Sequence, residues 1–326
     1  MKIIHYIRKP QEGFYSFERV FRDVRGALPP DLEVDVVHAW CHSRGLIGRA
    51  LNCLQVFCLR ADVVHVTGDI NYVVPFLIGR KSVLTVHDLA PLRAKTGWRR
   101  RVFRKLWYDW PLACTDAVTV VSNTIRSELS DETAYPVGQI EVIPNGVDPD
   151  FEMKPKAWPE RPTVLMVGTK PQKNLERMFH ALQGMDARVN VVGQLNKEQR
   201  SLAATLELEV NESGFLGQEA LVLAYRNTDM LAFVSLYEGF GLPVVEAQAT
   251  GRLVLTSNIA SLREVSGEAA ACLVDPLDVA SIRDGFERIL QNEDYRAALV
   301  RKGFENAKRY QFREVAASYA SAYERL

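Results

Sequence analysis

The sequence has no excess of charge of either sign, since 40 lysines and arginines balance 40 aspartates and glutamates in 326 residues. Proteins that coat nucleic acids are strongly basic, so we expect no nucleic-acid partner. No uninterrupted apolar run reaches the roughly 18 residues of a membrane-spanning helix. The opening apolar run is short and contains His5, unlike a signal peptide. We therefore expect a cytoplasmic protein.

Cysteine is also scarce, with five residues and no CxxC spacing. The five are Cys41, Cys53, Cys58, Cys114 and Cys272. An odd, scattered set argues against a disulfide framework. The pattern predicts reduced, buried thiols, as in a cytosolic protein.

Apolar residues make up 47% of the chain and charged residues 25%, which is typical of a globular protein. At roughly 100–200 residues per domain, the length predicts two domains. A chain of this length buries about three quarters of its unfolded surface, so it can form its core without covalent staples.

Short β-branched runs alternate with longer amphipathic stretches along the chain. In the first half, strands are predicted at 2–7, 33–40, 62–66, 82–86, 116–121 and 140–143, and helices at 16–28, 46–59 and 98–114. Such alternation predicts α/β architecture, with parallel sheets covered by helices on both faces. Four prolines between 149 and 162 indicate a linker, after which the alternation resumes. From residue 278 onward the sequence looks helical throughout.

The most informative segment runs from Ser235 to Ala247, where an apolar strand enters a glycine-rich turn and a helix opens at Pro243. Gly239 and Gly241 allow close backbone approach, and the helix N-terminus offers free N–H groups to an anion. Glu238 and Glu246 bracket the turn and suit sugar hydroxyls, which donate to carboxylates. The alternative is that Glu238 is a solvated turn residue and Glu246 stabilises the helix dipole.

Two further loops follow predicted strands. A buried strand ends at Gly168 and continues into Thr169-Lys170-Pro171-Gln172-Lys173, where lysines suit phosphate. This loop is neither GxGxxG nor a Walker A motif, so a dinucleotide enzyme or a P-loop enzyme is disfavoured. His87 ends another strand, at the mouth of the first half. Solvated lysines and a histidine that packs a loop are the alternative interpretations.

Together these segments resemble the retaining GT-B glycosyltransferases of family 4, which use nucleotide sugars. Glu238 and Glu246 have the E-x7-E spacing of that family, inside the phrase EGFGLPVVEA. The matching segments elsewhere are 121–122, 143–148, 215–217, 256–258, Glu264 and 274–276. The resemblance implies two Rossmann-like, doubly wound α/β domains that face each other across a cleft. It implies an acceptor-side domain at 1–155, a nucleotide-sugar domain at 156–310 and a helix at 311–326 that returns to the first domain.

The resemblance also implies residue roles. Glu246 matches the glutamate that holds the nucleotide ribose, Glu238 the one that holds donor-sugar hydroxyls, and Lys173 the lysine that binds the diphosphate. His87 matches a histidine that lines the sugar site, so His87, Lys173 and Glu238 are the catalytic candidates. The implied donor-binding set is Gly168, Thr169, Lys170, Lys173, Phe215, Leu216, Gly217, Glu238, Gly239, Phe240, Gly241, Leu242 and Glu246. Residues 215–217 resemble a strand that passes the nucleobase.

Two features depart from the family pattern. The family usually pairs its lysine with an arginine a few residues upstream, and Lys170 is the nearest counterpart here. Many members carry a double glycine in the first loop, where this sequence has only Gly13. These differences concern the groups that would contact the diphosphate.

We expect transfer of a hexose from a UDP- or GDP-linked donor to a hydroxyl of a glycan or lipid-linked acceptor, in bacterial surface polysaccharide synthesis. The nucleotide sugar is a co-substrate, and no cofactor or metal is expected because no DxD-like acidic cluster is placed at the cleft. The alternatives are a nucleotide-sugar 2-epimerase, a phosphorylase, and a non-catalytic subunit that binds sugar nucleotides.

Residues 93–110 form a local basic segment with a helical pattern. Between 93 and 105 there are seven basic residues and no acidic one: Arg93, Lys95, Arg99, Arg100, Arg101, Arg104 and Lys105. Trp98, Val102, Phe103, Leu106, Trp107 and Trp110 recur at helical spacing on an apolar face. This predicts either an ordinary domain helix or one that rests on an anionic membrane surface, at the inner face of the membrane.

Overall fold

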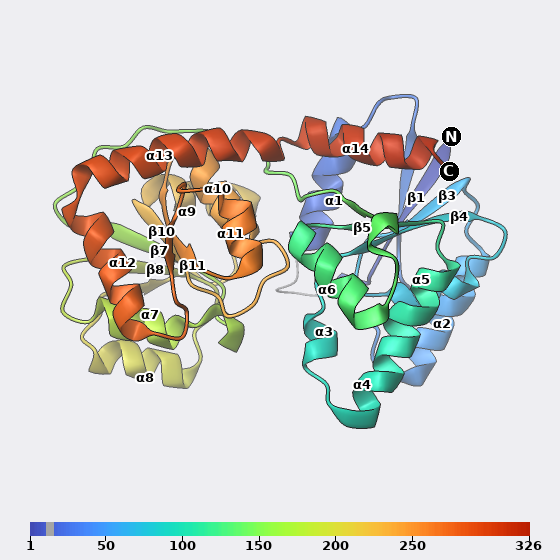
Figure 1. Ribbon diagram of the computed structural model, residues 1–326, viewed down its shortest axis with the longest axis horizontal. Coiled ribbons are helices and arrows are strands. Elements are labelled where there is room, and N and C mark those ends of the chain that lie inside the picture. The colour runs from blue at the N-terminus through green and yellow to red at the C-terminus, as the bar shows by residue number, and fades with distance from the viewer. Residues whose placement is uncertain (11–15) are drawn as a thin grey trace. The chain divides into compact units, whose positions relative to one another are not determined.

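The computed structural model describes residues 1–10 and 16–326, so Gly13, in the loop where many family members have a double glycine, lies outside the described residues. The chain divides into two compact units, shown in Figure 1. Unit 1 comprises Met1–Gly146 and Phe312–Leu326, and unit 2 comprises Val147–Gln311. Each unit contains a six-stranded sheet in which all the pairings are parallel. The predicted α/β class with two Rossmann-like sheets is therefore confirmed.

The sheet of unit 1 has the order β2-β1-β3-β4-β5-β6. Its strands are β1 (Lys2–Ile7), β2 (Glu33–His38), β3 (Val63–Val66), β4 (Lys81–Val86), β5 (Ala117–Val120) and β6 (Ile140–Val142). Its helical segments are α1 (Ser16–Ala27), α2 (Gly45–Phe57), η1 (Asn71–Phe76), α3 (Ala90–Arg93), α4 (Gly97–Arg104), η2 (Lys105–Asp109), α5 (Trp110–Cys114), α6 (Asn123–Thr133), η3 (Val137–Gln139) and α14 (Phe312–Glu324). The strands coincide with the predicted ones to within two residues at each end, because most of them are short runs rich in apolar and β-branched residues.

The sheet of unit 2 has the order β12-β11-β10-β7-β8-β9. Its strands are β7 (Thr163–Val167), β8 (Arg188–Val192), β9 (Val210–Glu212), β10 (Met230–Phe233), β11 (Leu253–Ser257) and β12 (Cys272–Val274). Its helical segments are η4 (Pro171–Lys173), α7 (Leu175–Leu182), α8 (Lys197–Thr205), α9 (Gln218–Asn227), α10 (Leu242–Ala249), α11 (Ala260–Ser266), α12 (Val279–Gln291), α13 (Glu293–Ala307) and η5 (Lys308–Tyr310). Two clusters of buried side chains fill the unit.

The last helix, α14, is packed into unit 1 by a buried polar network. The Tyr323 hydroxyl lies 3.0 Å from His5 Nε2 and 2.7 Å from His65 Nδ1. His65 Nε2 in turn lies 2.7 Å from Thr85 Oγ1 on β4. Because α14 buries Tyr319 and Tyr323 against β1 and β3, residues at opposite ends of the chain share one core.

The predicted helix at 98–114 is continuous but irregular. Its middle turn, η2, is a π-helix that lies between α4 and α5. Pro111 lacks an N–H and cannot donate to the carbonyl of Trp107, so a regular α-helical bond is lost at this point. The irregular turn carries Trp107 and Tyr108, and both are buried.

All five cysteines are free, but only Cys272 is buried, and Cys58 and Cys114 are exposed. The prediction of buried thiols is therefore wrong for most of them. No helix in the described part of the chain has the length and apolar character needed to cross a bilayer.

Candidate active site

In unit 2 the strand order reverses between β7 and β10. Successive strands β7, β8 and β9 run to one edge, whereas β10, β11 and β12 run to the other. Ligands of open α/β sheets bind beyond the carboxyl ends of the strands at such a switch point. The loops that follow β7 and β10 are joined there, because Leu236 N donates to the carbonyl of Gln172 at 2.8 Å. These loops are the two that the sequence singles out.

Lys173 and Glu238 meet at this switch point. Lys173 Nζ donates to Glu238 Oε1 at 2.6 Å, and both side chains are largely shielded from solvent. Lys173 Nζ also lies 4.4 Å from the ring centroid of Phe233, at the end of β10. Gly168 has φ of +89°, and a Cβ there would lie 3.1 Å from Lys173 Cε, so the glycine makes room for the lysine. The structure thus brings together the predicted phosphate-binding and sugar-binding groups.

The glycine-rich turn depends on backbone geometry that other residues rarely adopt. Gly241 has φ of +100° just before α10, and a Cβ there would clash with the side chain of Leu262. Asn174, at φ of +62°, is buried and donates to the carbonyls of Val234 and Pro276. The side chain of Asn174 therefore fixes the loop after β7 against the loop after β10. Asn174 was not among the residues predicted from the sequence, although an asparagine just before a helix is a signal for a left-handed backbone conformation.

Glu246 lies on α10 and is only 2% exposed. Tyr225 on α9 donates its hydroxyl to Glu246 Oε2 at 2.8 Å. A buried carboxylate held by a neutral hydroxyl retains acceptor capacity for further donors. This arrangement suits the predicted contact with ribose hydroxyls, which remains a prediction.

We expect Glu246→Gln to weaken binding of the nucleotide sugar by about 10- to 100-fold. The change replaces a charged acceptor by a neutral one, and a hydrogen bond to a charged group contributes about 1.5–3 kcal/mol. Calorimetric titration with the donor and with the free nucleotide measures the effect. Tyr225→Phe is the matched control, since it removes the hydroxyl that holds Glu246 and leaves the carboxylate in place. Unchanged affinity for both ligands in Glu246→Gln would remove Glu246 from the site.

The remaining predicted donor-binding residues lie in the segments that follow β7, β9 and β10, and one expectation about them is wrong. Residues 215–217 do not form a strand: β9 ends at Glu212, and Gly217 is the N-cap of α9. Phe215 is 64% exposed in this loop, so an aromatic face is available there to a base. Lys170 is exposed at the start of η4, and Phe240 is buried against Tyr310.

His87 follows β4 in unit 1 and is buried. Its Nε2 lies 2.9 Å from the carbonyl of Thr67 and must therefore carry the proton of the neutral ring. Burial, assisted by the charge of Arg8, lowers the pKa of His87 to about 4, although the bond to Thr67 opposes the shift. His87 is thus neutral near pH 7, with Nδ1 unprotonated.

A cavity of about 190 Å³ adjoins His87, and some of the residues that line it were not predicted from the sequence to belong to a binding site. Phe103 and Trp107 stack there at 4.6 Å, with Lys95 over the first ring and Arg49 over the second. Aromatic faces flanked by polar groups suit a sugar ring. The signal was present in the aromatic spacing of residues 98–110, but that spacing does not show which rings turn inward.

We expect His87→Ala to lower turnover and to leave affinity for the free nucleotide unchanged. His87 belongs to unit 1, whereas the predicted nucleotide-binding residues belong to unit 2. Steady-state kinetics and a titration with the bare nucleotide provide the two measurements. A large loss of nucleotide affinity would contradict this division of roles.

Solved structures define the fold class. Sucrose-phosphate synthase from Thermosynechococcus elongatus matches with a TM-score of 0.83 and 18% identity, over 100% of this chain and 99% of that one. The Anabaena protein HepE, solved in complex with UDP and glucose, matches with a TM-score of 0.82 and 17% identity, over 100% of both chains. The fold is therefore GT-B.

The family follows from the sequence. Residues 13–151 match Glycosyltransferase Family 4, and residues 148–306 match Glycosyl transferases group 1. The two matches together span most of the chain. This chain belongs to the family 4 glycosyltransferases, as the E-x7-E resemblance predicts.

Its curated relatives include mannosyltransferases. The serotype-specific mannosyltransferase WbdA of Escherichia coli is 28% identical over 87% of this chain, which spans 40% of that protein. The O-antigen chain mannosyltransferase B of Escherichia coli is 27% identical, over 83% of this chain and 77% of that protein. The chain thus spans less than half of the first relative and most of the second.

Proposed function

We propose that this protein transfers a hexose, with retention of configuration, from a nucleotide diphosphate sugar to a hydroxyl of a glycan or lipid-linked acceptor in bacterial surface polysaccharide synthesis. The names of the relatives favour a mannosyl donor and an O-antigen-like acceptor. The observation that carries the proposal is the Lys173–Glu238 pair at the switch point of unit 2.

The pair suggests how the donor is bound. A diphosphate carries more charge than one carboxylate, so it competes for Lys173 and releases Glu238. Glu238 is then available to accept hydrogen bonds from the donor sugar. Binding of the donor exchanges one ion pair for two sets of contacts, so Lys173 keeps an anionic partner and Glu238 keeps hydrogen-bond donors.

The reaction requires departure of the nucleoside diphosphate. As the sugar–oxygen bond breaks, negative charge grows on the phosphate, where Lys173 and the N–H groups at the start of α10 stabilise it. The acceptor hydroxyl attacks on the face that the phosphate leaves, through an oxocarbenium-like state. The leaving phosphate takes the acceptor proton. We propose that Lys173 supplies the positive charge for this step, without a metal ion.

A panel of GDP-mannose, UDP-glucose, UDP-galactose and UDP-N-acetylglucosamine tests the proposal. We expect slow hydrolysis of one donor without acceptor, and unchanged hydrolysis when EDTA is added. An isomerised sugar in place of the original one would indicate an epimerase. Phosphate-dependent cleavage of a glycan would indicate a phosphorylase, and tight binding with no turnover of any donor would indicate a binding subunit.

The finer proposal for the acceptor is that unit 1 holds it at an anionic membrane surface. The basic segment is less charged than its sequence suggests, because Arg93, Arg100 and Arg104 pair with Glu128, Glu132 and Asp109. Its apolar face is also divided: Phe103 and Trp107 turn inward, whereas Trp98, Val102, Leu106 and Trp110 are 40–69% exposed. Arg99, Arg101 and Lys105 remain exposed and form no ion pair with any residue that the structure describes.

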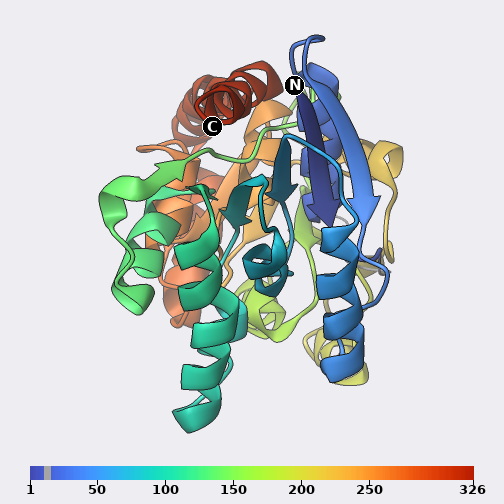
Figure 2. The same ribbon diagram turned by 90° about the vertical axis from the view of Figure 1, so that its right-hand side faces the viewer.

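Helix α2 adds a second exposed apolar row. Leu46, Ile47, Leu54 and Phe57 are 43–82% exposed. Phe76 of η1 links the two rows. The centroid of its ring lies 6.2 Å from that of Phe57 and 5.7 Å from that of Trp110. Figure 2 shows α2 in blue and α4 in teal projecting from the same end of unit 1. We call this surface, formed by the exposed residues of α2 and α4–α5, the apolar–basic face.

Vesicle sedimentation tests the apolar–basic face. We expect the protein to sediment with vesicles that contain phosphatidylglycerol but not with pure phosphatidylcholine, and salt should reverse the binding. Changing Arg99, Arg101 and Lys105 to glutamate should abolish sedimentation and spare donor hydrolysis. The same change at Lys197, Arg301 and Lys302 of unit 2 is the matched control. Equal recovery in the supernatant with both vesicle types would exclude the membrane contact and leave the donor proposal intact.

A further inference from the structure

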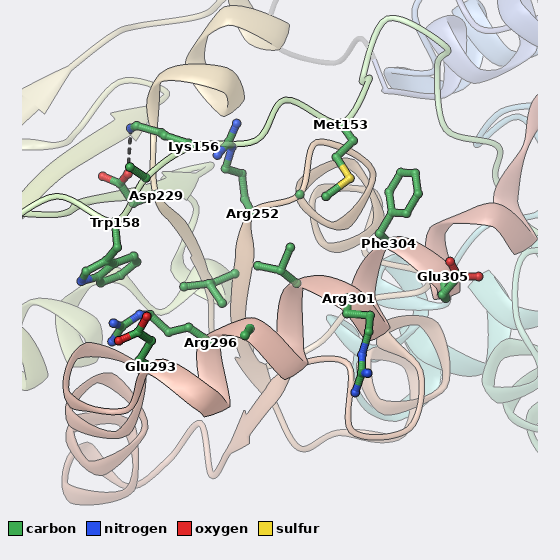
Figure 3. A pocket seen from close by; sticks show the side chains of 15 residues that line it. Met153, Lys156, Trp158, Asp229, Arg252, Glu293, Arg296, Arg301, Phe304 and Glu305 are labelled. Atoms are coloured by element: carbon green, nitrogen blue, oxygen red, sulfur yellow. Dashed lines mark ion pairs between the residues drawn. The ribbon is translucent and has the colours of Figure 1, made fainter.

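Unit 2 contains a cavity of about 430 Å³ at the opposite end of its sheet from the donor turn. Asp229 and Arg252 line the cavity and precede β10 and β11, whereas Glu238 follows β10. Figure 3 shows the cavity between the linker, which carries Met153, Lys156 and Trp158, and helix α13. The proposed donor reaction uses none of these residues.

The wall of the cavity holds a surplus positive charge. Lys156 Nζ pairs with Asp229 Oδ1 at 2.7 Å, as the dashed line in Figure 3 marks. Arg252 is only 5% exposed, and one of its terminal nitrogens donates to the carbonyl of Lys154 at 2.7 Å. Within the described part of the chain, Arg252 has no carboxylate at ion-pair distance, and its Nε has no hydrogen-bond partner. Burial lowers the pKa of Arg252, and the charge of Asp229 opposes this shift only in part. Because Asp229 also pairs with Lys156, one carboxylate serves two cations, and a buried cation that is incompletely compensated is costly.

The rest of the lining suits an apolar body. Leu253 and Val300 form an apolar patch beside Trp158, whose ring lies 4.6 Å from the guanidinium carbon of Arg296. That guanidinium donates to the last carbonyls of α12, at Ile289 and Leu290. The acidic side chains of Glu293 and Glu305 belong to exposed residues of α13, and Glu305 pairs with Lys308. Glu293 and Glu305 therefore lie toward the rim, whereas the buried part of the wall holds Arg252 and the single carboxylate of Asp229, which also pairs with Lys156.

We propose that this cavity binds a small organic anion whose carboxylate or phosphate meets Arg252 and whose apolar body lies against Leu253 and Val300. The anion supplies a second counter-charge beside Asp229, and the apolar patch excludes water from the resulting pair. The ligand would also bridge residues 153–158 and α13. These two segments lie close in the sequence to the two places where the chain passes between the units, 146–147 and 311–312. The site is thus a second binding site, remote from the donor turn.

Octanoate is the probe, and octan-1-ol and octylamine are probes with the same body and a different head. Calorimetric titration should show that octanoate binds at least tenfold more tightly than either. Arg252→Met should weaken octanoate binding by about 10- to 100-fold, the range expected for loss of a bond to a charged group. Lys302→Met, which removes an exposed cation of α13 outside the cavity, is the matched control and should change nothing. Ala297→Phe fills the cavity from an exposed position of α13 and should abolish binding with Arg252 intact.

A second measurement locates the ligand. Lys156 is an exposed tryptic site followed by Ala157, and a ligand that bridges the linker and α13 should slow cleavage there severalfold. Octanoate should protect the natural protein and the Lys302→Met variant, but not Ala297→Phe. Equal binding of octanoate and octan-1-ol, or unchanged binding in both Arg252→Met and Ala297→Phe, would overturn the proposal.

Discussion

Lys173→Ala should lower turnover at saturating donor by about 100- to 1,000-fold. A preorganised group that stabilises charge in the transition state typically contributes about this much, or roughly 3–4 kcal/mol. Donor affinity should fall less, because only the bond-breaking step concentrates charge on the diphosphate. The structure supports this expectation, since Lys173 is held at the switch point by Glu238 and by the space that Gly168 leaves.

Three comparisons make the measurement specific. Lys173→Arg keeps the charge and should recover part of the turnover, which a purely structural role of the ammonium would not predict. Lys170→Ala shows whether that exposed lysine replaces the family arginine, since only a phosphate contact would make its loss costly. Combining Lys173→Ala with Glu238→Gln gives the coupling energy of the pair. Unaffected turnover of Lys173→Ala at saturating donor would exclude the assignment.

The sequence allowed most of the fold to be predicted, and the reason is visible in unit 1. Buried strands such as β1 and β4 consist mainly of apolar or β-branched residues, which specify parallel strands locally. The path of α14 could not be predicted from local pattern. Its attachment depends on Tyr323, which meets His5 and His65 across more than 250 residues of chain.

The residues of the candidate site also fall into two groups, those that the local sequence predicts and those that only the folded chain brings together. Lys173 and Glu238 each follow a strand with a clear signal, and the topology brings them together. The partner of Glu246 was not predictable, because Tyr225 lies on a different helix. The basic segment shows the limit most clearly: its charge depends on Glu128, Glu132 and Asp109, and two of these lie on α6.

The histidines of unit 1 form a buried group that should make the protein sensitive to acid. His5, His65 and His87 surround Phe21, within 5.1–6.0 Å between ring centroids. Burial lowers the pKa of His5 to about 3, with a contribution from Arg25, and lowers the pKa of His65 well below its usual range. The pKa of His87 falls to about 4. The folded protein therefore holds these rings neutral, whereas the unfolded chain protonates them near pH 6.5.

We expect the free energy of unfolding of unit 1 to be highest above about pH 6.5 and to decrease as the pH is lowered toward 4. The unfolded state binds more protons in that range, so acid favours it. A shift from 6.5 to about 4 corresponds to a loss of about 2 kcal/mol per histidine between pH 7 and pH 5. His5 and His87 together would lose about 4 kcal/mol, a large part of the stability of an ordinary domain. Urea titrations followed by the fluorescence of Trp107 and the other tryptophans of unit 1 measure the change.

Two controls separate this effect from general acid unfolding. His87→Gln keeps a neutral polar side chain and should make the pH dependence less steep by about one proton's contribution. The histidine ring signals in NMR spectra of the folded protein should show three rings that do not titrate between pH 7 and pH 5. Ring signals of His5, His65 and His87 that all titrate near pH 6.5 in the folded protein would contradict the prediction, because groups with equal pKa in both states cannot couple folding to pH.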